Sequence, residues 1–171
     1  MSSQEQTEAM QMPPPAVVTD EHRWLQQLVG NWTYAMESVS PECGGGGGTG
    51  TQTIRMLGDL WLLAEAEGPA GDEMMRSIIT LGYDPEKKKF IGSFIASMMT
   101  HFWPYEGSLD ADGKTLRLAS QGPRFDGAPG PGIYEDVIEK VSDNEYLLRG
   151  RFKLDDGSFN EFMVSRYTRT K

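Results

Sequence analysis

The chain of 171 residues is long enough for one domain with a buried core, and its 16 basic and 25 acidic residues give a net charge of −9. An acidic surface repels phosphate backbones and anionic lipid, so we expect neither nucleic acid nor a membrane as a partner. The single cysteine, Cys43, excludes an internal disulfide, and the polar N-terminus does not resemble a secretory signal; together these features favour a cytoplasmic location.

The first segment of the chain, residues 1–19, is polar and then rich in proline. This composition predicts a disordered tail, followed by a single domain over residues 20–171. Asp20 is a favourable N-cap, apolar residues then recur at helical spacing, and Gly30 follows as a stop signal. We therefore expect a short helix over residues 20–29, and it is the only convincing helix in the sequence.

Beyond residue 30 the hydrophobic period changes to two, as in the alternation of Trp32, Tyr34 and Met36 with smaller or more polar residues. Tight-turn signals separate the alternating runs, which predicts about ten antiparallel strands joined as consecutive hairpins. The turn signals are Gly58-Asp59, Asp84-Pro85, Asp112-Gly113, Asp143-Asn144 and Asp156-Gly157. Hairpins without long crossovers favour an all-β fold, an antiparallel up-and-down β-barrel with a short N-terminal helix.

Familiar chemical motifs are weak or incomplete in this sequence. The run "CGGGGGTG" at residues 43–50 has the glycine spacing of a dinucleotide-binding loop, but a strand pattern follows it where that motif needs a helix. "DADGK" at residues 110–114 starts like a calcium loop and lacks its later ligands, so a hairpin turn is expected. With only His22 and His101, a histidine-rich metal site cannot be built. We assign no catalytic residue, metal ligand or cofactor.

The most apolar window, "FIGSFIASMMTHFWPYEG", runs from Phe90 to Gly107. Its first strand is apolar on both faces, as a strand that lines a cavity and is covered outside would be. We expect this strand to break at residues 97–100, which would place Met98 and Met99 at a barrel rim. Exposed thioethers there suit a binding mouth or a subunit contact. The alternative is that they pack onto a neighbouring loop.

After the break, His101, Trp103 and Tyr105 alternate onto one face and predict an aromatic wall with polar atoms along it. Tyr34 and Tyr134 are candidates for the facing wall by alternation alone. The alternative is a solid core on this face. The expected ligand-binding residues are Tyr34, Met98, Met99, His101, Trp103, Tyr105 and Tyr134.

The ordered blocks "LVGNWTY", "LGYDPEKKKFIGSF", "YEGSLDADGKTLRL", "YEDVIEKV" and "YTR" resemble an uncharacterised bacterial family, domain of unknown function 1579, over residues 21–169. The resemblance implies a calycin-like barrel and no established reaction. Gly30-Asn31-Trp32 is similar to the Gly-x-Trp opening of lipocalins, in which the tryptophan plugs the closed end beneath an arginine from the last strand. By position, Arg166 or Arg169 is the expected counterpart of that arginine.

The sequence therefore favours non-enzymatic binding of a small apolar ligand in a barrel cavity. One alternative is a barrel that binds haem or nitric oxide, as nitrobindin-like calycins do, with His101 as the axial ligand. Another is an enzyme in which His101 acts with Tyr105 or Glu106 as acid and base. A homodimer formed through an apolar rim is compatible with the favoured function.

Overall fold

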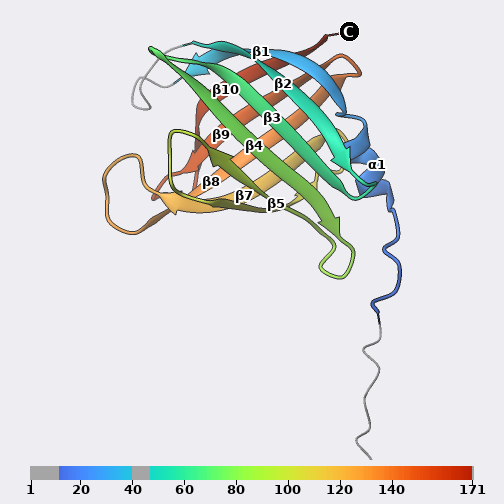
Figure 1. The fold of residues 1–171 in the computed structure, drawn as a ribbon. Coiled ribbons are helices and arrows are strands. Elements are labelled where there is room, and N and C mark those ends of the chain that lie inside the picture. Colours follow the sequence, from blue (N-terminus) through green and yellow to red (C-terminus); the bar gives the residue numbers. More distant parts are fainter. Residues whose placement is uncertain (1–11, 40–46, 171) are drawn as a thin grey trace, which may run out of the picture.

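The computed structural model describes residues 12–39 and 47–170, and ten strands among them form a closed antiparallel barrel with one helix (Figure 1). Each strand pairs with its neighbours in the chain, and β1 pairs with β10 to close the barrel. The predicted all-β barrel with a short N-terminal helix is confirmed. The elements are α1 (Asp20–Gln26), β1 (Gly30–Val39), β2 (Thr49–Leu57), β3 (Trp61–Ala70), β4 (Glu73–Asp84), β5 (Lys89–Ala96), β6 (Trp103–Leu109), β7 (Thr115–Pro123), β8 (Pro131–Ser142), β9 (Glu145–Lys153) and β10 (Phe159–Thr170).

The predicted turn signals lie between the strands, and their acidic residues stabilise them locally. The Asp84 carboxylate accepts the backbone N–H of Glu86 at 3.0 Å and that of Lys87 at 3.1 Å. Gly113 and Gly157 follow aspartates and have φ angles of 66° and 86°. A side chain in this left-handed region would be strained, so glycine suits these turns.

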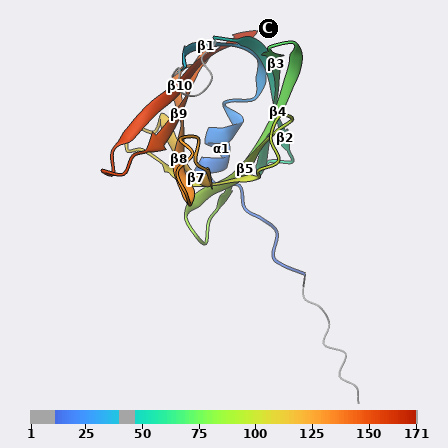
Figure 2. The ribbon, with the colours of Figure 1, turned by 90° about the vertical axis from the view of Figure 1, so that its left-hand side faces the viewer.

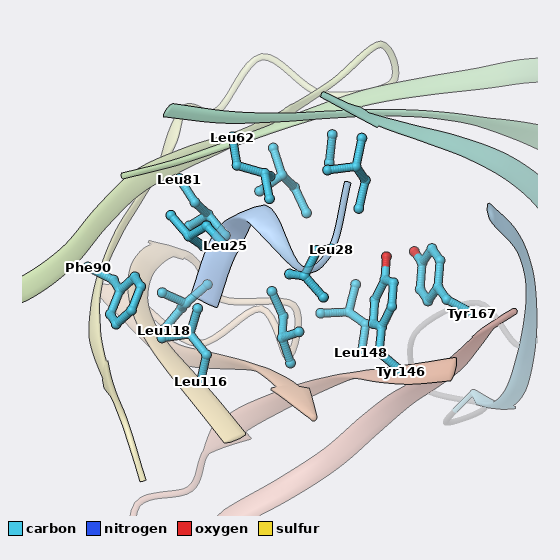
Figure 3. Packing of buried hydrophobic residues seen from close by; sticks show 14 of the residues in the cluster. Leu25, Leu28, Leu62, Leu81, Phe90, Leu116, Leu118, Tyr146, Leu148 and Tyr167 are labelled. Carbon is cyan, nitrogen blue, oxygen red and sulfur yellow. The ribbon is translucent and has the colours of Figure 1, made fainter. Parts of the chain in front are cut away.

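Helix α1 lies inside one end of the barrel, as the view along the barrel in Figure 2 shows. Its first residue follows Thr19, which is the N-cap in place of the expected Asp20. The N–H of Thr19 donates to His22 Nδ1 at 3.0 Å, which closes the first turn. Leu25 and Leu28 then point into the barrel among leucines and aromatic residues of the strands, and Figure 3 shows this core.

Trp32 lies just beyond the helix and seals this end of the barrel. It is 2% exposed, and its Nε1 donates to the Leu28 carbonyl at 2.9 Å. The guanidinium carbon of Arg169, on the last strand, lies 4.2 Å from the centroid of the Trp32 ring. Arg166 instead lies on the outer face, where it pairs with Glu37 and Glu145. Of the two arginines that the sequence offered, Arg169 is therefore the one that covers Trp32.

Replacing Arg169 with alanine is expected to lower the free energy of unfolding by about 1–3 kcal/mol. The change removes the contact with Trp32 and hydrogen bonds to the carbonyls of Gln27 at 3.0 Å and Asp143 at 2.9 Å. Arg166→Ala is the matched control and is expected to cost about 1 kcal/mol or less, because its ion pairs are partly solvated. Equal losses for the two variants in chemical denaturation would contradict this role of Arg169.

Two expectations concern segments at the limits of the structure. Most of the tail predicted at residues 1–19 lies outside the described residues, and residues 12–19 form neither helix nor strand. Residues 43–46 of the glycine run also lie outside them, and strand β2 follows the run. No helix within residues 12–39 and 47–170 is long and apolar enough to cross a membrane.

Candidate functional site

A cavity of about 730 Å³ occupies the half of the barrel away from α1. Large side chains from the helix and strands fill the half near α1, whereas small residues such as Ala66 and Ser77 face inward farther along the barrel. The strand connections that follow β1, β3, β5 and β7 border the cavity at its far end. The sequence therefore builds a barrel that is solid at one end and hollow at the other.

A column of aromatic rings connects the sealed end with one wall of the cavity. The Trp32 ring packs edge-on against Tyr146, with centroids 4.9 Å apart. Tyr146 stacks on Tyr167 at 4.4 Å with an interplanar angle of 8°, and Tyr34 lies 5.3 Å from Tyr167. The Tyr146 hydroxyl donates to Gln52, which fixes the column in place (Figure 3 shows Tyr146 and Tyr167). Tyr34 and Tyr167 thus present rigid rings to the cavity.

A second aromatic group forms another part of the wall, close to the mouth. Trp103 on β6 packs edge-on against Tyr134 on β8, with centroids 5.0 Å apart. Phe125, from the connection between β7 and β8, lies 5.2 Å from Tyr134, and Phe162 lies 6.3 Å from it. The Tyr134 hydroxyl donates to the Pro123 carbonyl at 2.5 Å. These contacts hold apolar ring surface toward the cavity.

One carboxyl group, that of Asp136 on β8, lies deep in the cavity wall. Asp136 is half-buried and borders the cavity. Burial in the barrel raises its pKa to about 6 despite the hydrogen bond that it accepts from the Tyr105 hydroxyl. The neighbouring Glu135 carboxylate adds to this rise in pKa. Burial and the Asp136 charge in turn raise the pKa of Tyr105 well above its usual value, so Tyr105 stays a hydrogen-bond donor.

Two serine residues add polar atoms to the cavity wall. Ser120 on β7 and Ser165 on β10 are 8% and 2% exposed. The Ser120 hydroxyl is buried without a hydrogen-bond partner among the described residues. A buried, unpaired hydroxyl costs free energy unless a bound group satisfies it.

Six of the seven residues expected in a ligand site line the cavity, namely Tyr34, Met98, Met99, Trp103, Tyr105 and Tyr134. The expected break in the strand is confirmed, because β5 ends at Ala96 and β6 begins at Trp103. Met99 accepts a hydrogen bond at its sulfur from Trp103 Nε1 at 3.1 Å. Both methionines therefore lie at the mouth, in contact with the cavity.

His101 is the exception, because its ring lies outside the cavity lining. It precedes β6, and its Nε2 lies 3.0 Å from the carbonyl oxygen of Gln121 on β7. Nε2 must donate there, since a carbonyl oxygen only accepts. The pairing of β6 with β7 covers only Glu106–Leu109 of β6, so His101 joins these strands near the mouth where the ladder is absent.

The acid–base partners considered for His101 are directed elsewhere. The Tyr105 hydroxyl donates to Asp136 inside the barrel, and Glu106 forms an ion pair with Lys89 on the outer face. Across residues 12–39 and 47–170, no cluster of three or more His, Cys, Asp or Glu residues could hold a metal ion.

Sequence reasoning did not identify the other lining residues, and among those with polar groups that matter for the chemistry of the cavity are Ser120, Asp136, Ser165 and Tyr167. Asp136 carried a usable signal, since it lies two positions after Tyr134 and shares its face of β8. The two serines gave no comparable signal, because small polar residues occur on both faces of a strand.

The family model described as "Protein of unknown function (DUF1579)" matches residues 18–169, so the chain belongs to that family. No curated protein matches the chain. Solved structures that resemble it include a redesigned β-barrel, at 12% identity and a TM-score of 0.47, covering 87% of this chain and 96% of that one. Another is a de novo designed fluorescence-activating β-barrel, at 13% identity and a TM-score of 0.43, covering 85% and 96% of the two chains.

Proposed function

We propose that this member of the DUF1579 family binds a small, mainly apolar molecule inside its barrel and catalyses no reaction on it. The observation that carries the proposal is the cavity of about 730 Å³, which is lined mostly by apolar and aromatic side chains. Cavities of roughly 300–1,000 Å³ with such walls are typical of sites for small molecules and cofactors. Burial of apolar surface, at about 25 cal/mol per Å², is the main source of affinity.

The mouth of the cavity is suited to the entry of an apolar guest. Met98 and Phe125 border the cavity and are 61% and 54% exposed. Methionine side chains are flexible and polarizable, so they adapt to guests of different shape. The rings of Trp103 and Tyr134 behind them are held by their neighbours. The site therefore combines an adaptable entrance with a rigid wall, which limits the entropy lost on binding.

The haem and acid–base alternatives have less support. Both require His101 to face the bound molecule, and its ring lies outside the cavity lining with Nε2 engaged by Gln121. The carboxyl group that lines the described cavity is that of Asp136, and neither His22 nor His101 lines it. The inward-facing residues therefore support the binding of a small molecule over either alternative.

A lipocalin-like relationship is part of this proposal. Its support is the Gly30-Asn31-Trp32 sequence at the start of β1 and the position of Arg169 over the Trp32 ring. Gly30 has a φ of 145°, and a side chain there would also collide with Arg169. The glycine, tryptophan and arginine therefore act together at the sealed end.

Two substitutions test binding by titration with Nile red, a neutral apolar fluorophore. Trp103→Ala removes part of the aromatic wall, and Ala66→Phe fills the cavity. We expect each to weaken the affinity for Nile red by about tenfold or more. The matched control is Phe102→Ala, because Phe102 is 58% exposed and lies outside the cavity lining.

The control variant should bind Nile red like the unmodified protein. Equal affinity in all four proteins would place the dye outside the cavity. Absence of binding to the unmodified protein, measured also with smaller neutral naphthalene compounds, would contradict the proposed function.

A further inference from the structure

Among the described residues that line the cavity, Asp136 is the only Asp, Glu, Lys, Arg or His. The groups that act on its pKa are Tyr105 and Glu135, and no cation is among them. Charged residues on the outer face of the barrel pair with one another, as Glu135 does with Arg117 and Arg151. An inward carboxylate without a cationic partner is costly, so its retention in the wall calls for a functional reason.

Other polar atoms of the cavity lie near this carboxyl group. Ser120 is opposite Tyr134 in the pairing of β7 and β8, one step along the inward face from the Leu118–Asp136 pair. Its hydroxyl is buried without a partner among the described residues and is available to accept or donate a hydrogen bond. The Tyr167 hydroxyl on β10 is close enough for the Asp136 charge to raise its pKa. Acceptor atoms from three strands therefore converge on one region.

The walls around this region favour positive charge. The faces of aromatic rings attract cations, and Tyr34, Trp103 and Tyr134 line the same cavity. The net charge of −9 attracts cations toward the protein in general. An anionic guest would meet Asp136 with no cationic side chain to offset it in the described lining.

We infer that the guest is an apolar, aromatic-sized molecule that carries one protonated amine, and that Asp136 binds the amine while Ser120 accepts or donates a hydrogen bond beside it. This inference rests on the proposed function, which supplies the apolar site for the body of the guest. The Asp136 carboxylate is removed from bulk water when the protein folds, so this desolvation cost does not have to be met again on binding. More of the attraction between the carboxylate and the amine therefore contributes to affinity than at a fully hydrated carboxylate.

The groups around Asp136 also determine how binding depends on pH. Tyr105 on β6 and Tyr167 on β10 stay neutral donors, because burial raises their pKa values, and the same holds for Tyr34 on β1. Glu135 faces outward and pairs with Arg117 and Arg151. Asp136 is therefore the group whose protonation, near its pKa of about 6, removes the charge that an amine recognises.

Calorimetric titration with three compounds of one shape tests the inference near neutral pH. They are 1-naphthylmethylamine, which is cationic, 1-naphthylmethanol, which is neutral, and 1-naphthylacetate, which is anionic. We expect the amine to bind about tenfold or more tightly than the alcohol, and the acetate to bind weakest. In Asp136→Asn the amine should fall to the affinity of the alcohol, whose own affinity should change little.

The matched control is Asp72→Asn, which removes one negative charge from the exposed connection between β3 and β4, outside the cavity lining. It should keep the preference for the amine. Equal affinity for amine and alcohol, tighter binding of the acetate, or an amine preference that survives Asp136→Asn would overturn the inference and leave the proposed function in place. Absence of binding by all three compounds and by Nile red would remove both.

Discussion

Replacing Trp32 with alanine is expected to lower the free energy of unfolding by about 3–5 kcal/mol, as truncation of a large buried aromatic residue does. Trp32 is 2% exposed and packs against Tyr146 and beneath Arg169. Its Nε1 also donates to the Leu28 carbonyl, which ties the helix end to β1. The substitution would leave a cavity at the sealed end and remove the ring that supports the aromatic column.

Chemical denaturation followed by circular dichroism measures this loss. Trp61→Ala is the matched control, because Trp61 lies on β3 with 38% of its surface exposed, and it should cost about 1 kcal/mol. If Trp32→Ala lowered the denaturation midpoint no more than Trp61→Ala does, Trp32 would not be the residue that seals the barrel.

Replacing Asp136 with asparagine is expected to raise the free energy of unfolding near neutral pH by about 3 kcal/mol. The folded barrel raises the pKa of Asp136 from 3.8 to about 6, mainly because burial disfavours its charge. Between these two values the folded state binds more protons than the unfolded state, so stability contributed by Asp136 is present at low pH and lost as the pH rises. Asparagine is neutral at every pH and can still accept the hydrogen bond from Tyr105.

The pH dependence of this stability gain provides an internal control. The gain from Asp136→Asn should be largest above about pH 6 and should vanish below about pH 3, where the carboxyl is protonated in both states. Asp72→Asn, at an exposed turn, should show no such pH dependence. Destabilisation by Asp136→Asn at neutral pH would mean that the carboxylate has a favourable partner in the free protein. A residue that costs stability and faces a cavity is typical of a site kept for binding.

The fold could be predicted because its signals are local. Asp-Gly pairs such as those at 112–113 and 156–157 require conformations that few other residues adopt, so they located the hairpins well. The helix starts at Asp20 as expected, but its N-cap is Thr19, which forms the cap together with His22, and the helix ends at Gln26 and not at residue 29. Propensity identified the cap region, but the pairing of those two side chains depends on the folded turn.

The site was harder to predict because the inward face is set by barrel closure. In "YEDVIEKV", both alternating faces of β8 carry an acid and an aliphatic residue, so only the placement of Tyr134 on the wall indicated that Asp136 and not Glu135 faces inward, and barrel closure was needed to establish that placement. His101 was assigned to the wall by extending the alternation of Trp103 and Tyr105 backwards. The strand begins only at Trp103, so the alternation does not reach His101.

A crystal structure of the protein with 1-naphthylmethylamine would show both the cavity and the carboxylate in use. We expect the naphthalene ring inside the barrel, against Trp103 and Tyr134, with the amine nitrogen about 2.7–3.2 Å from an oxygen of Asp136. A ring bound on the outer surface, or an amine directed to the mouth and away from Asp136, would contradict it.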